Sequence, residues 1–146
     1  MDQTSPHPLW LGRRGEGRDY RRVIDAGIQA LVHLAEEETP DQPPRKLIYC
    51  RIPLVEGAGN PSVLLDLAVS TVADLLRLRV PTLLYGDGGI SRIPTIAAVA
   101  LSLIFGETPE KCLNWVVQQH ACDVTPGLWD EVKEMLDRRV SRQPRP

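Results

Sequence analysis

The segment best suited to chemistry is a glycine-rich turn at residues 86–92, which follows a short apolar stretch and ends at Arg92. A strand, a tight glycine turn and a buried helix point backbone N–H groups and a helix N-terminus into one concavity, which attracts an anion. The planar guanidinium of Arg92 matches the oxygens of a phosphate group. The turn lacks the lysine of GxxxxGK[ST] and the third glycine of GxGxxG, so neither common nucleotide-binding motif fits.

The elements that would position this turn alternate along the chain. Apolar runs predict strands at 9–12, 30–35, 46–53 and 80–85, and periodicity with end signals predicts helices at 17–27, 60–79, 91–105, 108–120 and 126–139. We expect Asn60 to cap helix 60–79, with Pro61 in its first turn. The alternation predicts an α/β fold with a central, mostly parallel sheet of about four to five strands and helices on both faces. Ligands of such sheets bind at the carboxyl ends of the strands, which favours loops 54–60 and 86–91.

Length and composition limit the class of protein. The chain has 146 residues and a formal net charge of −2, which suit one domain at 9–140 between a loose lead-in at 1–8 and a flexible tail at 141–146. A charge near zero argues against a nucleic-acid partner. The N-terminus lacks the pattern of a signal peptide, and no apolar run has transmembrane length, so we expect a cytoplasmic protein without a membrane partner.

The segment from Tyr85 to Thr95 resembles the HCxxGxxR signature of cysteine-dependent protein tyrosine and dual-specificity phosphatases, often continued as SRSPT. The matching residues are Gly89, Ser91, Arg92, Pro94 and Thr95. Residues 25–35 and 52–56 also look like segments of this family, so the similarity covers roughly residues 9–136 and is closest to small, minimal dual-specificity phosphatases. The resemblance implies the dual-specificity phosphatase fold and a phosphate-binding loop made of Gly86, Asp87, Gly88, Gly89, Ile90, Ser91 and Arg92.

The sequence departs from the family pattern at the residues that do the chemistry. The resemblance places the family's nucleophilic cysteine at Gly86 and its preceding histidine at Tyr85. Glycine has no side chain to attack phosphorus, so the covalent reaction is lost. The three cysteines, Cys50, Cys112 and Cys122, lie outside the loop, and we expect them to be core residues. The candidate general-acid position holds Glu56 instead of aspartate.

Three functional hypotheses remain open. The leading one is a catalytically inactive pseudophosphatase with a phosphate- or oxyanion-binding loop, which needs no metal or cofactor and takes a phosphorylated protein or a small phosphate-bearing ligand. The second is a phosphatase with non-cysteine chemistry that uses water, Asp87 or Glu56. The third is a structural scaffold that binds a protein through a surface such as Trp115 or Trp129, although their helical spacing favours packing. A carboxylate at Asp87 would repel an anion unless it points to solvent.

Overall fold

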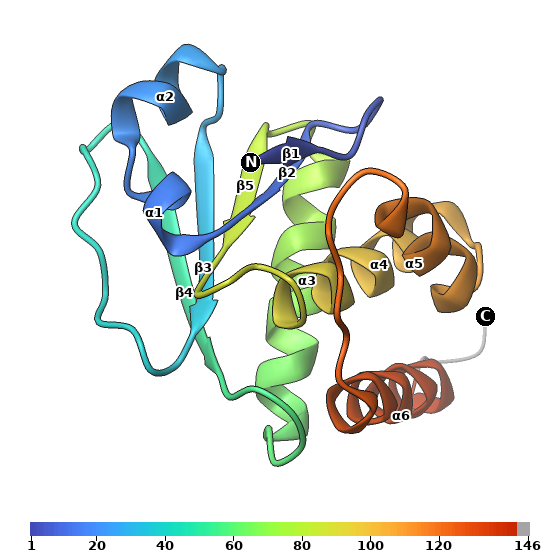
Figure 1. Ribbon diagram of the computed structural model, residues 1–146. Helices are drawn as coiled ribbons and strands as arrows, with labels where there is room; N and C mark the ends of the chain where they lie inside the picture. The colour runs from blue at the N-terminus through green and yellow to red at the C-terminus, as the bar shows by residue number, and fades with distance from the viewer. Residues whose placement is uncertain (143–146) are drawn as a thin grey trace.

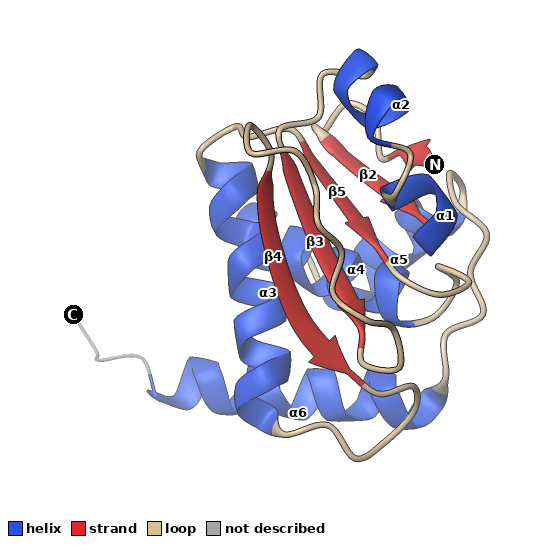
Figure 2. Cartoon of the chain, turned by 90° about the vertical axis from the view of Figure 1, so that its left-hand side faces the viewer, coloured by secondary structure: helices blue, strands red, loops and turns tan. Residues whose placement is uncertain are grey.

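A five-stranded sheet forms the centre of the computed structural model, which describes residues 1–142. The strand order is β1-β2-β5-β3-β4, and only the β1–β2 pair is antiparallel, which confirms the predicted mostly parallel sheet (Figure 2). The strands are β1 (Asp2–Gln3), β2 (Leu9–Gly12), β3 (Ala30–Ala35), β4 (Ile48–Leu54) and β5 (Thr82–Tyr85).

Helices cover both faces of the sheet, as predicted (Figure 1). One face carries α1 (Arg14–Gly17) and α2 (Tyr20–Asp25). The other face carries α3 (Ser62–Arg77), α4 (Arg92–Phe105), α5 (Pro109–Val117) and α6 (Pro126–Arg142). The predicted α/β architecture is therefore confirmed.

Two apolar cores lie on opposite faces of the sheet, and alternation along β3 explains both. Val32 and Leu34 point into the larger core, where α4 packs against α3, α5 and α6. Leu31 points into the smaller core beneath α2, together with Leu83 and Tyr85 of β5. Successive side chains of a strand point to opposite faces, so a strand covered on both sides is apolar along its length. This pattern is the reason that segment 30–35 is predictable from sequence.

The register of the parallel strands brings their carboxyl ends to one edge of the sheet. Tyr85 at the end of β5 pairs with Gly12 of β2 and with His33 of β3, and Ala35 pairs with Leu54 at the end of β4. The chain then continues from these ends into the loops at 36–38, 55–61 and 86–91. These loops therefore lie next to one another, as the topology of an open parallel sheet requires.

Two local expectations are corrected. The helix expected at 17–27 is shorter: it is α2, which begins after Asp19, whose side chain caps it by accepting a hydrogen bond from Arg22 N at 3.2 Å. The separate helix α1 precedes the expected segment and ends at Gly17. Asn60 does not cap α3, whose N-cap is Pro61. The Asn60 side chain instead accepts a hydrogen bond from Val55 N at 2.8 Å and donates one to Val55 O at 2.9 Å. Its amide thus closes the loop before the helix.

The lead-in at 1–8 contributes to the sheet, although the sequence suggests a loose segment. Residues 2–3 form β1, and the Met1 ammonium forms an ion pair with Glu16. In the predicted tail, residues 141–142 belong to α6, and residues 143–146 lie outside the described part of the chain. Among the described residues, none of the helices has the length and apolar character that crossing a membrane requires.

Candidate functional site

A pocket of about 250 Å³ lies where the predicted loop meets three other segments. Its lining residues are Glu56, Gly86, Asp87, Gly88, Gly89, Ile90, Ser91, Arg92, Ile93, Asp123 and Thr125. The fold therefore gathers every predicted loop residue and the candidate acid Glu56 around one concavity. Asp123 and Thr125, from the connection between α5 and α6, are additions that the sequence did not suggest.

Glycine is required in the turn between β5 and α4. Gly89 has φ +72°, and a Cβ there would lie 2.8 Å from the carbonyl oxygen of Gly12 at the end of β2. A side chain at this position would therefore clash with backbone as well as strain the turn. Asp87 also has a positive φ, of 39°, a region that aspartate and asparagine tolerate better than most residues. The turn closes with a hydrogen bond from Gly89 N to Gly86 O at 3.0 Å.

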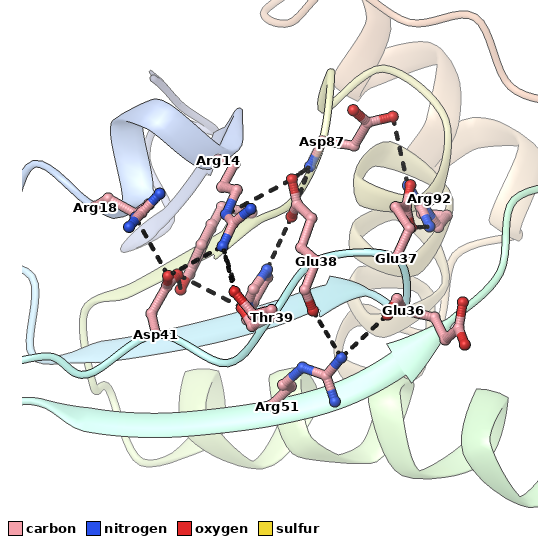
Figure 3. Close-up of polar contacts among 12 residues, drawn as sticks. Arg14, Arg18, Glu36, Glu37, Glu38, Thr39, Asp41, Arg51, Asp87 and Arg92 are labelled. Atoms are coloured by element: carbon pink, nitrogen blue, oxygen red, sulfur yellow. Dashed lines mark hydrogen bonds and ion pairs between the residues drawn. The ribbon is translucent and has the colours of Figure 1, made fainter.

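Within the part of the chain that the structure describes, Arg92 is the only cation that lines the pocket, and it is held from one side by a carboxylate. Its side chain is 4% exposed. Nη1 and Nη2 donate to the two oxygens of Glu37 at 2.6 and 2.7 Å (Figure 3). Nη1 also donates to Leu54 O at 2.8 Å. Burial acts to lower the pKa of Arg92, but the contacts with Glu37 outweigh it and raise that pKa; the same hydrogen bonds lower the pKa of Glu37. Arg92 is therefore a fixed, charged group.

The opposite edge of the guanidinium faces two further carboxylates. Nη2 lies 3.6 Å from Asp87 Oδ2, and Nε lies 3.8 Å from Glu56 Oε2, both beyond hydrogen-bond distance. Glu56 accepts hydrogen bonds from the hydroxyls of Ser91 at 2.7 Å and Thr125 at 2.9 Å. The pocket edge of Arg92 thus remains open to a ligand, but with acidic groups on both sides.

Gly86 leaves the position expected for a nucleophile without a functional group. A Cβ added at Gly86 would lie 3.1 Å from both the Cβ and the backbone nitrogen of Ala35, at the end of β3. The cysteines do not replace it, because Cys50, Cys112 and Cys122 are absent from the pocket lining. Cys112 is buried, whereas Cys50 and Cys122 are half-buried against the same core. Burial raises the pKa of each thiol, which works against thiolate formation.

A buried polar cluster lies beneath the loop, at the position that resembles the family's histidine. The Tyr85 hydroxyl donates to Asp41 Oδ2 at 2.7 Å, and its ring stacks on His33 with ring centroids 4.6 Å apart. Burial, followed by the hydrogen bond to Asp41, raises the pKa of Tyr85, which keeps the phenol neutral. His33 Nε2 lies 2.9 Å from Glu38 Oε1, and both oxygens of Glu38 accept from the backbone N–H of Asp87 at 3.1 Å. The cluster therefore anchors the start of the loop.

Two acidic residues that no sequence motif singles out organise this site. Glu37 and Glu38 lie between the predicted strands at 30–35 and 46–53, and they bind Arg92 and the Asp87 backbone (Figure 3). Their position directly after strand 30–35 was the available signal, because the carboxyl ends of parallel strands meet. No comparable signal marks His120, which lies beyond the end of α5 at Val117 although the sequence predicts a helix to residue 120. Its Nε2 donates to Gly89 O at 2.6 Å, and its Nδ1 lies 2.7 Å from Asp2 Oδ2.

Solved structures with this fold are dual-specificity phosphatases and related proteins. Human DUSP28 superposes with a TM-score of 0.84 at 18% sequence identity, covering 98% of this chain and 100% of that one. A mouse putative dual-specificity phosphatase complexed with zinc tungstate gives a TM-score of 0.82 at 16% identity, over 97% and 89% of the two chains. The human tyrosine phosphatase-like serine/threonine/tyrosine-interacting protein gives 0.80 at 15% identity, over 96% and 97%.

Comparison of the sequence with family models and with curated proteins finds no match. The similarity therefore lies in the three-dimensional structure, at identities that establish the fold and leave the activity to the residues of the site. The chain has the dual-specificity phosphatase fold that its sequence resembles.

Proposed function

We propose that this chain is a pseudophosphatase: a protein with the dual-specificity phosphatase fold that performs no cysteine-dependent phosphatase reaction and binds an oxyanion in the loop at residues 86–92. The main support for this proposal is the combination of Gly86, which supplies no nucleophile, with Arg92, which is buried and charged beside the pocket. Covalent phosphatase chemistry requires a nucleophile at position 86, whereas oxyanion binding requires only Arg92 and the backbone around it.

The pocket supplies donors suited to a tetrahedral anion. The Nε and Nη2 atoms of Arg92 face the pocket, and in the described chain the backbone N–H groups of Gly88, Ile90 and Ser91 have no hydrogen-bond acceptor. One neighbour in fold, the mouse protein, is complexed with zinc tungstate, whose anion is tetrahedral. These features support an oxyanion-bearing ligand, carried either by a phosphorylated protein or by a small phosphate-bearing molecule.

The first test measures catalysis and binding separately. The natural protein should not hydrolyse an aryl phosphate above the uncatalysed rate, whereas calorimetry should detect phenyl sulfate or inorganic phosphate in the pocket. Arg92→Lys keeps the charge but loses the planar fork, so it should weaken binding at least several-fold. Circular dichroism controls for folding of the variant. Unchanged binding in folded Arg92→Lys would contradict the proposal.

The same assay examines non-cysteine catalysis. Aryl-phosphate turnover that disappears in Asp87→Asn or Glu56→Gln would overturn the proposal in favour of an enzyme that uses a carboxylate or water. Restoring the family cysteine with Gly86→Cys is a poor rescue experiment, because the new Cβ would press on Ala35. Pairing it with Ala35→Gly removes the contact with the Ala35 methyl group and leaves the one with the backbone nitrogen.

A further inference from the structure

The charges around the pocket do not favour a doubly charged ligand. Among the described residues, Arg92 is the single cation of the lining, and Glu37 already neutralises it from outside the pocket. Asp87 and Glu56 lie within 4 Å of the same guanidinium and line the pocket themselves, and Asp123 is a third acidic residue of the lining. An entering anion thus meets one neutralised cation and three acidic residues, and each negative charge on the ligand adds to the repulsion.

Neutral donors partly offset this repulsion, but some of them are already used. The Asp87 N–H donates to Glu38, the Gly89 N–H donates to Gly86 O, and the hydroxyl of Ser91 donates to Glu56. The unengaged donors are the remaining N–H groups of the loop and the pocket edge of Arg92. Hydrogen bonds from such dipoles can hold the oxygens of a singly charged group without the excess positive charge that a phosphate dianion needs.

Asp87 is the residue that distinguishes this loop most directly from a dianion site. Its side chain is 68% exposed, and its carboxylate pairs with Arg92 Nη2 at 3.6 Å. Its backbone is held on both sides of the Cα atom, because Asp87 N donates to Glu38 and Asp87 O accepts from Arg14 N at 3.1 Å. The carboxylate is thus held at the mouth of the pocket and not carried on a mobile segment.

Resting on the oxyanion-binding function proposed above, we infer that Asp87, together with Glu56, restricts the pocket to singly charged oxyanion esters. The favoured ligand class comprises phosphodiesters and sulfate monoesters, and phosphomonoester dianions are disfavoured. Among the ligands considered above, this inference favours a small phosphodiester over a phosphorylated protein side chain. Asp87 is then a specificity-determining residue, which selects by ligand charge.

The test uses three probes that share one aryl group. Phenyl phosphate is a dianion near pH 7.5, whereas methyl phenyl phosphate and phenyl sulfate are monoanions. The natural protein should bind the two monoanions more tightly than phenyl phosphate in calorimetry. A carboxylate about 4 Å from the bound anion, in a dielectric close to that of water, weakens binding about fivefold for each ligand charge, so removing it should raise the affinity by that factor. In Asp87→Asn, the affinity for phenyl phosphate divided by the affinity for either monoanion should therefore rise about fivefold.

Glu36→Gln is the matched control. It removes the same charge from an exposed side chain next to Glu37, in a position that lacks any described side-chain contact with Arg92. Asparagine tolerates the positive φ of position 87, so Asp87→Asn should fold. Equal gains for all three probes, or the same shift in Glu36→Gln, would overturn the charge selection while leaving oxyanion binding intact. Failure of every probe to bind either the natural protein or Asp87→Asn would overturn the proposed function and this inference together.

Comparing the two monoanions identifies the chemistry of the ester. Tighter binding of methyl phenyl phosphate assigns the pocket to phosphodiesters, and tighter binding of phenyl sulfate assigns it to sulfate esters. Tighter binding of phenyl phosphate than of either monoanion by the natural protein would contradict the inference, because the two carboxylates would then exert no control over ligand charge.

Discussion

At the scale of single residues, close packing around Tyr85 explains a glycine whose role the sequence does not reveal. A Cβ at Gly17 would lie 2.3 Å from the Tyr85 ring, whereas a Cβ at Gly15 of the same helix would meet nothing within 4 Å. The ring in turn stacks on His33 and is fully buried, so it has little freedom to move aside. The bulky phenol ring of Tyr85 thus goes together with a glycine facing it.

We predict that Gly17→Ala lowers the free energy of unfolding by about 3 kcal/mol, because the methyl group overlaps the Tyr85 ring. Gly15→Ala should instead stabilise the protein by up to about 1 kcal/mol, through the helix preference of alanine. Urea denaturation of both variants checks the prediction. Equal effects of the two substitutions would show that the ring can yield and that its packing does not require Gly17.

A second prediction at this scale concerns pH. The hydrogen bonds with Arg92 lower the pKa of Glu37 below its ordinary value of 4.5, so the folded state favours the ionised form. This stabilisation is fully present above pH 4.5 and is lost as the pH falls through the lowered pKa of Glu37. Glu37→Gln should therefore be less stable than the natural protein at neutral pH and approach it on acidification. Denaturation curves at several pH values measure the difference.

The neighbouring Glu36→Gln again serves as the control for this pH experiment, because its side chain is exposed and its described contact runs through its backbone carbonyl. A stability deficit of Glu37→Gln that is equally large at neutral and acidic pH would rule out the ion pair with Arg92 as its cause. The half-exposed position of Glu37 keeps the expected deficit modest.

At the scale of elements, α6 holds the loop that carries Glu56. The Glu131 carboxylate accepts hydrogen bonds from Gly59 N at 2.9 Å and from Asn60 N at 3.2 Å. The same loop is closed internally by the Asn60 side chain on Val55. The position of Glu56 in the pocket therefore depends on a helix about seventy residues away in sequence, because the charged Glu131 of that helix binds the loop backbone.

We predict that Glu131→Ala speeds hydrogen exchange at the Gly59 and Asn60 amides and costs about 1 kcal/mol of unfolding free energy. Glu134→Ala removes an exposed glutamate from the same helix that pairs with Arg138, so it should leave those amides unchanged. Similar exchange rates in both variants would mean that α6 does not restrain the loop.

At the scale of the whole molecule, His120 joins three segments that are distant in sequence. It donates a hydrogen bond to the Gly89 carbonyl of loop 86–91, faces Asp2 of β1, and follows α5. The N-terminal strand and the connection between α5 and α6 thereby support the pocket from outside. The half-buried Trp115 and Trp129 pack against the larger core, as their helical spacing predicts.

His120→Ala should lower the free energy of unfolding by about 2 kcal/mol, because it leaves a buried carbonyl without its donor. It should also increase hydrogen exchange in loop 86–91 and in β1, because His120 contacts Gly89 of the loop and Asp2 of β1. Gln119→Ala, which removes the preceding side chain, is the control. A loss of stability without faster exchange at both distant regions would contradict the linking role of His120.

The sequence by itself determined the layered α/β fold, because a strand buried on both faces and a helix with one apolar stripe each have a recognisable local pattern of apolar residues. It also predicts a missing nucleophile, because the resemblance to the phosphatase signature places Gly86 six residues before Arg92, where that signature has cysteine. Only the tertiary structure decided the electrostatics of the pocket, where Glu37, Glu38 and Asp87 converge on a single loop. Charge interactions depend on distances between segments remote in sequence, and no periodicity or local motif encodes those distances.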